Sequence, residues 1–160
     1  MYIRGDDADG TGKKKQWAMV GDTFVVGCDL PSCLIMPELN ALHGDGGKSM
    51  YTGECGMYVP GCGLDQVQCS WGHDEYLYRI VTSDKNPNIL PEEARYIIRF
   101  HSLYAYHEGG AYQMLMDDKD KRLLPILQEF NKYDLYSKCD DVYDLETMKA
   151  YYMQLIHKFF

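Results

Sequence analysis

The sequence of 160 residues lacks several patterns that mark common classes of protein. Six cysteines are present without a single C-x-x-C pair, whereas structural zinc sites present their cysteines roughly two to four residues apart. No stretch approaches the roughly 18 consecutive apolar residues of a membrane-spanning helix, and no apolar run follows Arg4 to act as a signal peptide. We therefore expect unpaired thiols in a reducing compartment, and a cytoplasmic protein without a membrane partner.

Basic residues are also scarce, because 16 Lys and Arg stand against 24 Asp and Glu and give a net charge of -8. This charge disfavours nucleic acid as a partner. Apolar and aromatic side chains are abundant instead, with 46% hydrophobic residues and 14 tyrosines. A chain of this length buries about two-thirds of the surface that its unfolded form exposes, so these residues can form a sizeable core.

The polarity of the chain changes after residue 15. Residues 1–15 are glycine-rich and charged, and we expect them to be disordered. Gly12-Lys13 is no phosphate loop, because it lacks both the glycine five positions earlier and the Ser or Thr after the lysine. Residues 16–160 are predicted to form one domain, in which 29–63 carry many Gly and Pro and predict a long irregular loop.

Helical periodicity of apolar residues predicts four helices, over about 64–82, 91–109, 118–130 and 145–158. Pro91 and two following acids suit a helix start, Asp144 suits an N-cap, and Pro125 is expected to bend or divide the third helix. Strand signals are few. The prediction is therefore an all-α fold, with Asp134 in a connecting turn between the last two helices.

Two histidines and an aspartate are the candidate metal ligands. His73 lies in 70–76 (SWGHDEY), His101 in 98–102 (IRFHS), and Asp134 in 133–138 (YDLYSK). Each histidine alone is more often a packed imidazole than a ligand. Two imidazoles and one carboxylate from separate segments, however, are a ligand set typical of non-haem iron, so the combination predicts a metal site.

Two other features suit a polyol ligand. Gly21-Asp22 interrupts an apolar run, and it combines close backbone approach with a carboxylate, although an ordinary turn is the commoner explanation. Lys138 stands four residues after Asp134, where it pairs with that aspartate, donates to a substrate hydroxyl, or lies solvated on the surface. His107, near a predicted helix end where an imidazolium suits the helix dipole, is assigned no role.

At these residues the sequence resembles the myo-inositol oxygenase family. The similar phrases are 20–24 (VGDTF), 60–65 (PGCGLD), 70–76, 98–102 and 130–138 (FNKYDLYSK), within a resemblance that runs from Trp17 to the C-terminus. It implies an all-α, HD-superfamily-like oxidoreductase that holds two irons and uses dioxygen to open the ring of myo-inositol, forming D-glucuronate. No nicotinamide or haem is implied.

The resemblance also implies roles for individual residues. His73 and His101 would be ligands of one iron, and Asp134 a ligand of the other. The inositol contacts would come from residues at five positions: Gly21, Asp22, His101, Ser102 and Lys138. No catalytic residue is assigned.

The sequence departs from the family upstream of Trp17. There the family has a metal histidine, a His-Asp pair whose aspartate bridges the irons, and a substrate lysine, whereas residues 1–15 contain no histidine. The neighbours of His73-Asp74 match a later helix, so Asp74 is not predicted to be a ligand. We therefore expect the C-terminal part of such an enzyme, with an incomplete iron site and doubtful activity of its own.

Two alternatives stay open. The first is a noncatalytic family member that acts as a polyol-binding or interaction module. The second is a mononuclear iron centre built from His73, His101 and Asp134 alone.

Overall fold

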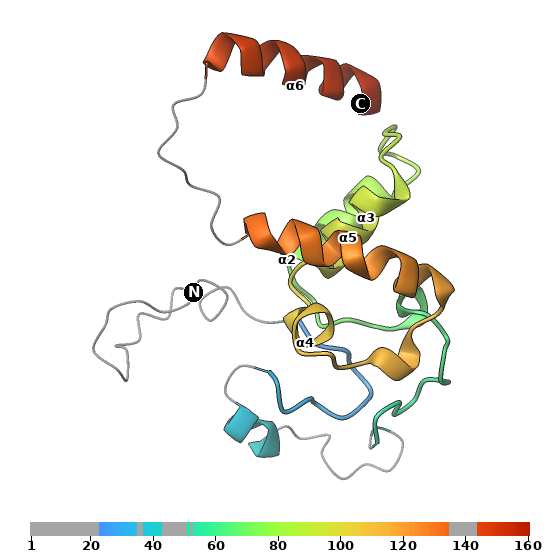
Figure 1. Cartoon of the computed structure of the whole chain (residues 1–160). Coiled ribbons are helices and arrows are strands. Elements are labelled where there is room, and N and C mark those ends of the chain that lie inside the picture. Colours follow the sequence, from blue (N-terminus) through green and yellow to red (C-terminus); the bar gives the residue numbers. More distant parts are fainter. Residues whose placement is uncertain (1–22, 35–36, 43–50, 52, 135–143) are drawn as a thin grey trace, which may run out of the picture.

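The computed structural model describes residues 23–34, 37–42, 51, 53–134 and 144–160, and these form a helical protein (Figure 1). The segment 1–15 and the residues Gly21, Asp22 and Lys138 lie outside the described residues. The α-helices of the described ranges are α2 (His73–Val81), α3 (Glu92–Phe100), α4 (Tyr104–His107), α5 (Asp118–Asp134) and α6 (Leu145–Phe159). Within the described ranges the sole β feature is an isolated bridge between Val25 and Cys69, which confirms the all-α prediction.

The predicted helix over 64–82 is wrong in its first half. Only a 3-10 turn, η3 (Leu64–Gln66), and α2 are helical there. The stretch between them bonds to a distant segment instead, because Val26 N–H donates to the Gln68 carbonyl and Ser70 N–H to that of Phe24, both at 2.8 Å. Those backbone groups are therefore unavailable for a helix, and α2 begins only after Gly72.

The predicted helix over 91–109 is two helices. The helix begins close to the predicted start, with Pro91 as the N-cap of α3 rather than in its first turn, but α3 ends at Phe100. Leu103 has ψ 61, which is not helical, and its side chain is fully buried. The chain thus bends inward at Leu103 and begins the short helix α4, so that His101 lies at the end of α3 rather than inside a longer helix.

The last two helices agree better with the prediction. Helix α5 continues through Pro125 and ends at Asp134, so placing Asp134 in a connecting turn was wrong: it belongs to the last helical turn. Helix α6 begins after Asp144, whose carboxylate accepts a hydrogen bond from Glu146 N–H as an N-cap. The irregular region 29–63 contains one described 3-10 helix, η1 (Pro37–Leu42).

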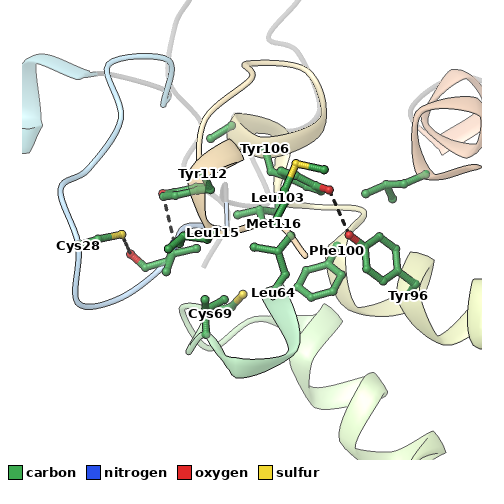
Figure 2. Packing of buried hydrophobic residues seen from close by; sticks show 14 of the residues in the cluster. Cys28, Leu64, Cys69, Tyr96, Phe100, Leu103, Tyr106, Tyr112, Leu115 and Met116 are labelled. Atoms are coloured by element: carbon green, nitrogen blue, oxygen red, sulfur yellow. Dashed lines mark hydrogen bonds between the residues drawn. The ribbon is translucent and has the colours of Figure 1, made fainter. Parts of the chain in front are cut away.

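The core lies where α3, α4 and α5 meet the segments around Leu64 and Leu115 (Figure 2). Helix α3 packs against both α2 and α5, and α4 packs against α5. Phe100, Leu103 and Tyr106 are at most 1% exposed and point into this core. Burying each such side chain contributes about 1.5–3 kcal/mol, which fixes the ends of α3 and α4 relative to α5.

A buried carboxylate organises the polar part of the core. Asp120 accepts hydrogen bonds from Leu64 N–H at 2.8 Å, Asp117 N–H at 3.0 Å and the Tyr96 hydroxyl at 3.0 Å. The Tyr96 hydroxyl also lies 3.2 Å from that of Tyr106 (Figure 2). These five residues form the Asp120 cluster, which ties the segment before α2 to α3, α4 and α5.

A buried ion pair joins α2 to α3. Glu75 is 1% exposed, and its carboxylate accepts from Arg99 at 2.9 Å and from Arg79 at 2.8 Å. Because Glu75 lies two residues after His73 and Arg99 two before His101, this ion pair holds the two histidine segments side by side.

No helix in the described part of the chain is long and apolar enough to cross a membrane.

Candidate metal centre

The two predicted histidine ligands face each other. His73 is the first residue of α2, and His101 follows the last residue of α3. Their Nε2 atoms are 3.0 Å apart and their ring centroids 5.0 Å apart, with the ring planes inclined at 75°. The histidine pair, His73 and His101, thus joins residues that are 28 positions apart in the sequence.

The backbone of α3 fixes the proton on His101. Its Nδ1 lies 3.2 Å from the carbonyl oxygen of Ile97 and 3.1 Å from that of Ile98. Carbonyl oxygens only accept hydrogen bonds, so Nδ1 carries a proton, which leaves Nε2, the atom nearest His73, as the nitrogen that can offer a lone pair to a ligand. An imidazole held this way by a backbone carbonyl is typical of metal-ligating histidines.

The spacing of the pair suits a shared cation. Imidazole nitrogens lie about 2.1 Å from a first-row metal ion, and two such ligands at a right angle are therefore about 3.0 Å apart. The observed distance between the Nε2 atoms of His73 and His101, 3.0 Å, agrees with this expected separation. A hydrogen bond from a protonated His73 Nε2 to His101 gives the same distance without a metal. The residues present fit a metal ion, and their role as ligands stays a prediction.

Ser102 joins the pair, whereas Asp134 does not. The Ser102 hydroxyl lies 3.3 Å from His73 Nε2. The Asp134 carboxylate instead accepts a hydrogen bond from the Tyr104 hydroxyl at 3.0 Å. Within the part of the chain that the structure describes, no group of three or more His, Cys, Asp or Glu side chains converges as a metal site. The geometry thus gives no support to a mononuclear centre that includes Asp134.

His107 supports this site in a way that sequence reasoning missed. Its Nε2 donates to the carbonyl oxygen of His101 at 2.9 Å. Burial lowers the pKa of His107, so the ring is neutral and the expected imidazolium at a helix end was wrong. No sequence signal separates His107 from an exposed histidine, because its burial results from the bend at Leu103.

The cysteines of the described residues join no group of three or more metal-capable side chains. The five described cysteines are free thiols, as predicted, and Cys139 lies outside the described residues. Burial raises the pKa of Cys28 to about 11 and that of Cys69 to about 12. Both are therefore protonated near neutral pH and are poor metal ligands.

A cavity of about 640 Å³ lies beside the segment that follows the predicted inositol residues Gly21 and Asp22. It is bounded mainly by 24–30, Met57, Tyr58 and Gln68. None of the described residues predicted for the site lines this cavity, so it is separate from the histidine pair.

The fold and the histidine pair define a class of protein: a helical protein with a candidate centre for a redox-active or Lewis-acidic metal. Comparison with known sequences narrows this class. The sequence model described as myo-inositol oxygenase matches residues 10–160. The chain therefore belongs to the myo-inositol oxygenase family, and its all-α fold is the one expected for that family.

Three relatives illustrate the extent of this match. The chain is 48% identical over 145 residues to the inositol oxygenase of Mus musculus, covering 90% of this chain and 50% of the relative. It is 47% identical to inositol oxygenase 2 of Arabidopsis thaliana, covering 91% and 45%, and 43% identical to the inositol oxygenase of Dictyostelium discoideum, covering 92% and 50%. The chain thus spans about half the length of the curated relatives it matches.

Proposed function

We propose that this chain supplies part of the iron and inositol site of an inositol oxygenase, an enzyme that opens the ring of myo-inositol with dioxygen to form D-glucuronate. One observation carries the proposal: the 3.0 Å separation of the Nε2 atoms of His73 and His101, in a chain whose relatives are named inositol oxygenases. In this proposal His73 and His101 hold one iron, Asp134 holds a second, and the protein acts in the cytoplasm.

The chain's own groups prepare the pair for a metal ion. The Ile97 and Ile98 carbonyls keep the His101 proton on Nδ1, so that Nε2 is available as a ligand without losing a proton. His73 binds through Nε2 only when that atom is unprotonated. Iron, when bound, supplies Lewis acidity and the redox capacity to use dioxygen.

The substrate groups are assigned by their chemistry. Myo-inositol is an uncharged polyol, so its recognition requires many hydrogen-bonding groups. The Ser102 hydroxyl lies beside the histidine pair, where it donates to a substrate hydroxyl. Gly21, Asp22 and Lys138 complete the proposed inositol contacts, together with His101.

The second proposed iron ligand is oriented by a tyrosine. Tyr104, at the start of α4, donates to Oδ2 of Asp134 at the end of α5. This hydrogen bond restricts rotation of the carboxylate. It joins the proposed second ligand to the helix that also carries His107, and His107 in turn contacts the His101 carbonyl.

Anaerobic titration with Fe²⁺ tests the metal assignment. The chain is expected to bind Fe²⁺, and His73→Ala and His101→Ala should each weaken binding at least about tenfold, because each removes one ligand. His157→Ala is the matched control, since His157 is exposed on α6 and should leave binding unchanged. Equal binding by all four proteins would refute the assignment.

Calorimetry with myo-inositol separates the proposed function from the polyol-binding module. Inositol binding that requires Fe²⁺ and the Ser102 hydroxyl supports an oxygenase site, as does inositol-dependent oxygen uptake with formation of D-glucuronate. Inositol binding by metal-free protein that is unchanged by His73→Ala supports the noncatalytic module instead.

A further inference from the structure

Asp74, which follows His73 in α2, is a buried carboxylate outside the proposed ligand set. It is fully buried, with Oδ2 accepting a hydrogen bond from the Thr23 hydroxyl at 2.8 Å and Oδ1 accepting from Glu75 N–H at 2.9 Å. A carboxylate is costly to bury unless it accepts hydrogen bonds, so Thr23 and the Glu75 N–H together stabilise and orient the Asp74 carboxylate.

Thr23 also contacts the other histidine segment. Its side chain is 4% exposed, and its backbone N–H donates to the Ser102 carbonyl oxygen at 3.1 Å. One residue therefore bonds to the residue after His73 through its hydroxyl and to the residue after His101 through its backbone. Thr23 itself follows Asp22, a predicted inositol contact.

The segment that begins at Thr23 is held firmly from the other side. Phe24 N–H donates to the Ser70 hydroxyl at 3.2 Å, and Ser70 N–H returns a bond to the Phe24 carbonyl at 2.8 Å. The isolated bridge between Val25 and Cys69 extends this pairing. These contacts thus hold the residues that follow Thr23 against the segment that leads into α2.

Gly72 leaves the space that Asp74 occupies. A Cβ at Gly72 would lie 2.6 Å from Oδ1 of Asp74 and 3.8 Å from the Thr23 hydroxyl oxygen. Any residue other than glycine at position 72 would therefore displace the Asp74 carboxylate. The glycine, the carboxylate and the hydroxyl are therefore packed as one unit at the start of α2.

We propose that Thr23 and Asp74 are positioning residues, whose hydrogen bond, together with the backbone bond from Thr23 to Ser102, sets His73 at the distance from His101 that a shared metal ion requires. This inference rests on the proposed function, in which the histidine pair is the metal site. Neither residue touches the metal in this scheme. They act by fixing where α2 begins relative to the end of α3.

The test measures Ni²⁺ affinity by calorimetry with the 160-residue chain. Ni²⁺ is chosen because affinity for nitrogen ligands rises from Fe²⁺ to Ni²⁺. Thr23→Val keeps the shape of the side chain and removes the hydroxyl, and should weaken Ni²⁺ binding about tenfold or more, as removal of groups that orient metal ligands does. Thr23→Ser restores the hydroxyl and should bring the affinity back to within about twofold of the original.

Tyr106→Phe separates positioning from loss of stability. It removes a buried hydroxyl that bonds to Tyr96 elsewhere in the core. It should lower the midpoint of urea unfolding but leave Ni²⁺ affinity unchanged. If Thr23→Val binds Ni²⁺ as tightly as the original chain, or if Tyr106→Phe weakens binding as much as Thr23→Val, the positioning role is refuted.

Two further variants keep the outcome decisive. Should Thr23→Val fail to fold, Asp74→Asn makes the same comparison, because it keeps the size of the side chain and removes one acceptor. His73→Ala separates the two proposals. If it leaves Ni²⁺ affinity unchanged, the metal site and the positioning role are both refuted; if it abolishes binding while Thr23→Val does not weaken it, only the positioning role is.

Discussion

The Asp120 cluster and the histidine pair both join separate helices through polar side chains, but their hydrogen bonds are completed differently. Asp120 is 1% exposed and accepts from three donors of the protein itself. In the histidine pair, the Nε2 atoms of His101 and His73 lie 3.0 Å apart, and His73 is exposed.

This difference distinguishes a cluster that stabilises the fold from a pair of side chains that can bind a ligand. A carboxylate whose acceptor sites are used by buried donors stabilises the fold and has little left to offer a ligand. Two imidazole nitrogens that lie 3.0 Å apart, one of them on an exposed ring, can instead complete their bonding with a metal ion. We therefore expect substitutions in the Asp120 cluster to change stability and substitutions in the histidine pair to change metal binding.

The largest effect is expected from Asp120→Ala. This change leaves the backbone N–H groups of Leu64 and Asp117 unsatisfied, at a cost of about 1–3 kcal/mol each, and also removes one of the two partners of the Tyr96 hydroxyl. The free energy of unfolding, measured in urea, should fall by about 4 kcal/mol or more. Asp118→Ala is the control, because that side chain is 99% exposed. Equal losses of stability for both variants would contradict the structural role of the Asp120 cluster.

The histidine pair should affect stability only when metal is present. With Ni²⁺ at about 100 times its dissociation constant, binding to the folded state adds about 2.7 kcal/mol to the free energy of unfolding. His73→Ala should remove most of this gain and change the metal-free stability little, since His73 is exposed. Thermal unfolding with and without Ni²⁺ measures both quantities. A gain that persists in His73→Ala would place the metal elsewhere.

The same substitution, tyrosine to phenylalanine, can be made beside two carboxylates, Asp120 and Asp134, and its effect on stability compared. Tyr96→Phe removes a donor to the buried Asp120, and should cost about 1.5–3 kcal/mol, as is usual for a hydrogen bond to a buried charged group. Tyr104→Phe removes the donor to Asp134, which is only half-buried, and should cost about 1 kcal/mol or less. Urea unfolding measures both, and a larger loss for Tyr104→Phe would reverse the assignment of the structural site.

The smallest effect is expected at Cys69, a residue of neither cluster. Burial raises its pKa from 9.0 to about 12, so its contribution to stability is complete below pH 9 and is lost as the pH rises toward 12. At pH 8 Cys69 should resist alkylation by iodoacetamide, while the exposed Cys33 reacts. Mass spectrometry of peptides gives the extent of modification, and rapid modification of Cys69 in folded protein would contradict its burial.

Local signals predicted the parts of the fold that local interactions determine. Asp144 was identified as an N-cap, and its carboxylate accepts from Glu146 N–H. The helix predicted over 64–82 failed because residues 67–72 include backbone groups bonded to 24–26, more than 40 positions away. Periodicity of apolar residues does not report such distant pairing.

The candidate site, too, was predicted only in the part that local sequence signals reveal. Residue types and the family resemblance singled out His73, His101 and Ser102, and the structure brings these three together. The groups that hold them were missed, because Thr23 and Asp74 meet across 51 positions and His107 reaches His101 only through the bend at Leu103. Sequence reasoning singled out side chains of types that can bind a ligand, but not the distant residues that contact their segments.

X-ray absorption at the iron edge of the anaerobic, Fe²⁺-loaded chain tests the central claim most directly. If the histidine pair shares one iron, the spectrum should show two imidazole nitrogens at about 2.1 Å, and a single one after His73→Ala or His101→Ala. A spectrum without imidazole ligands, or one that neither substitution changes, would contradict the account.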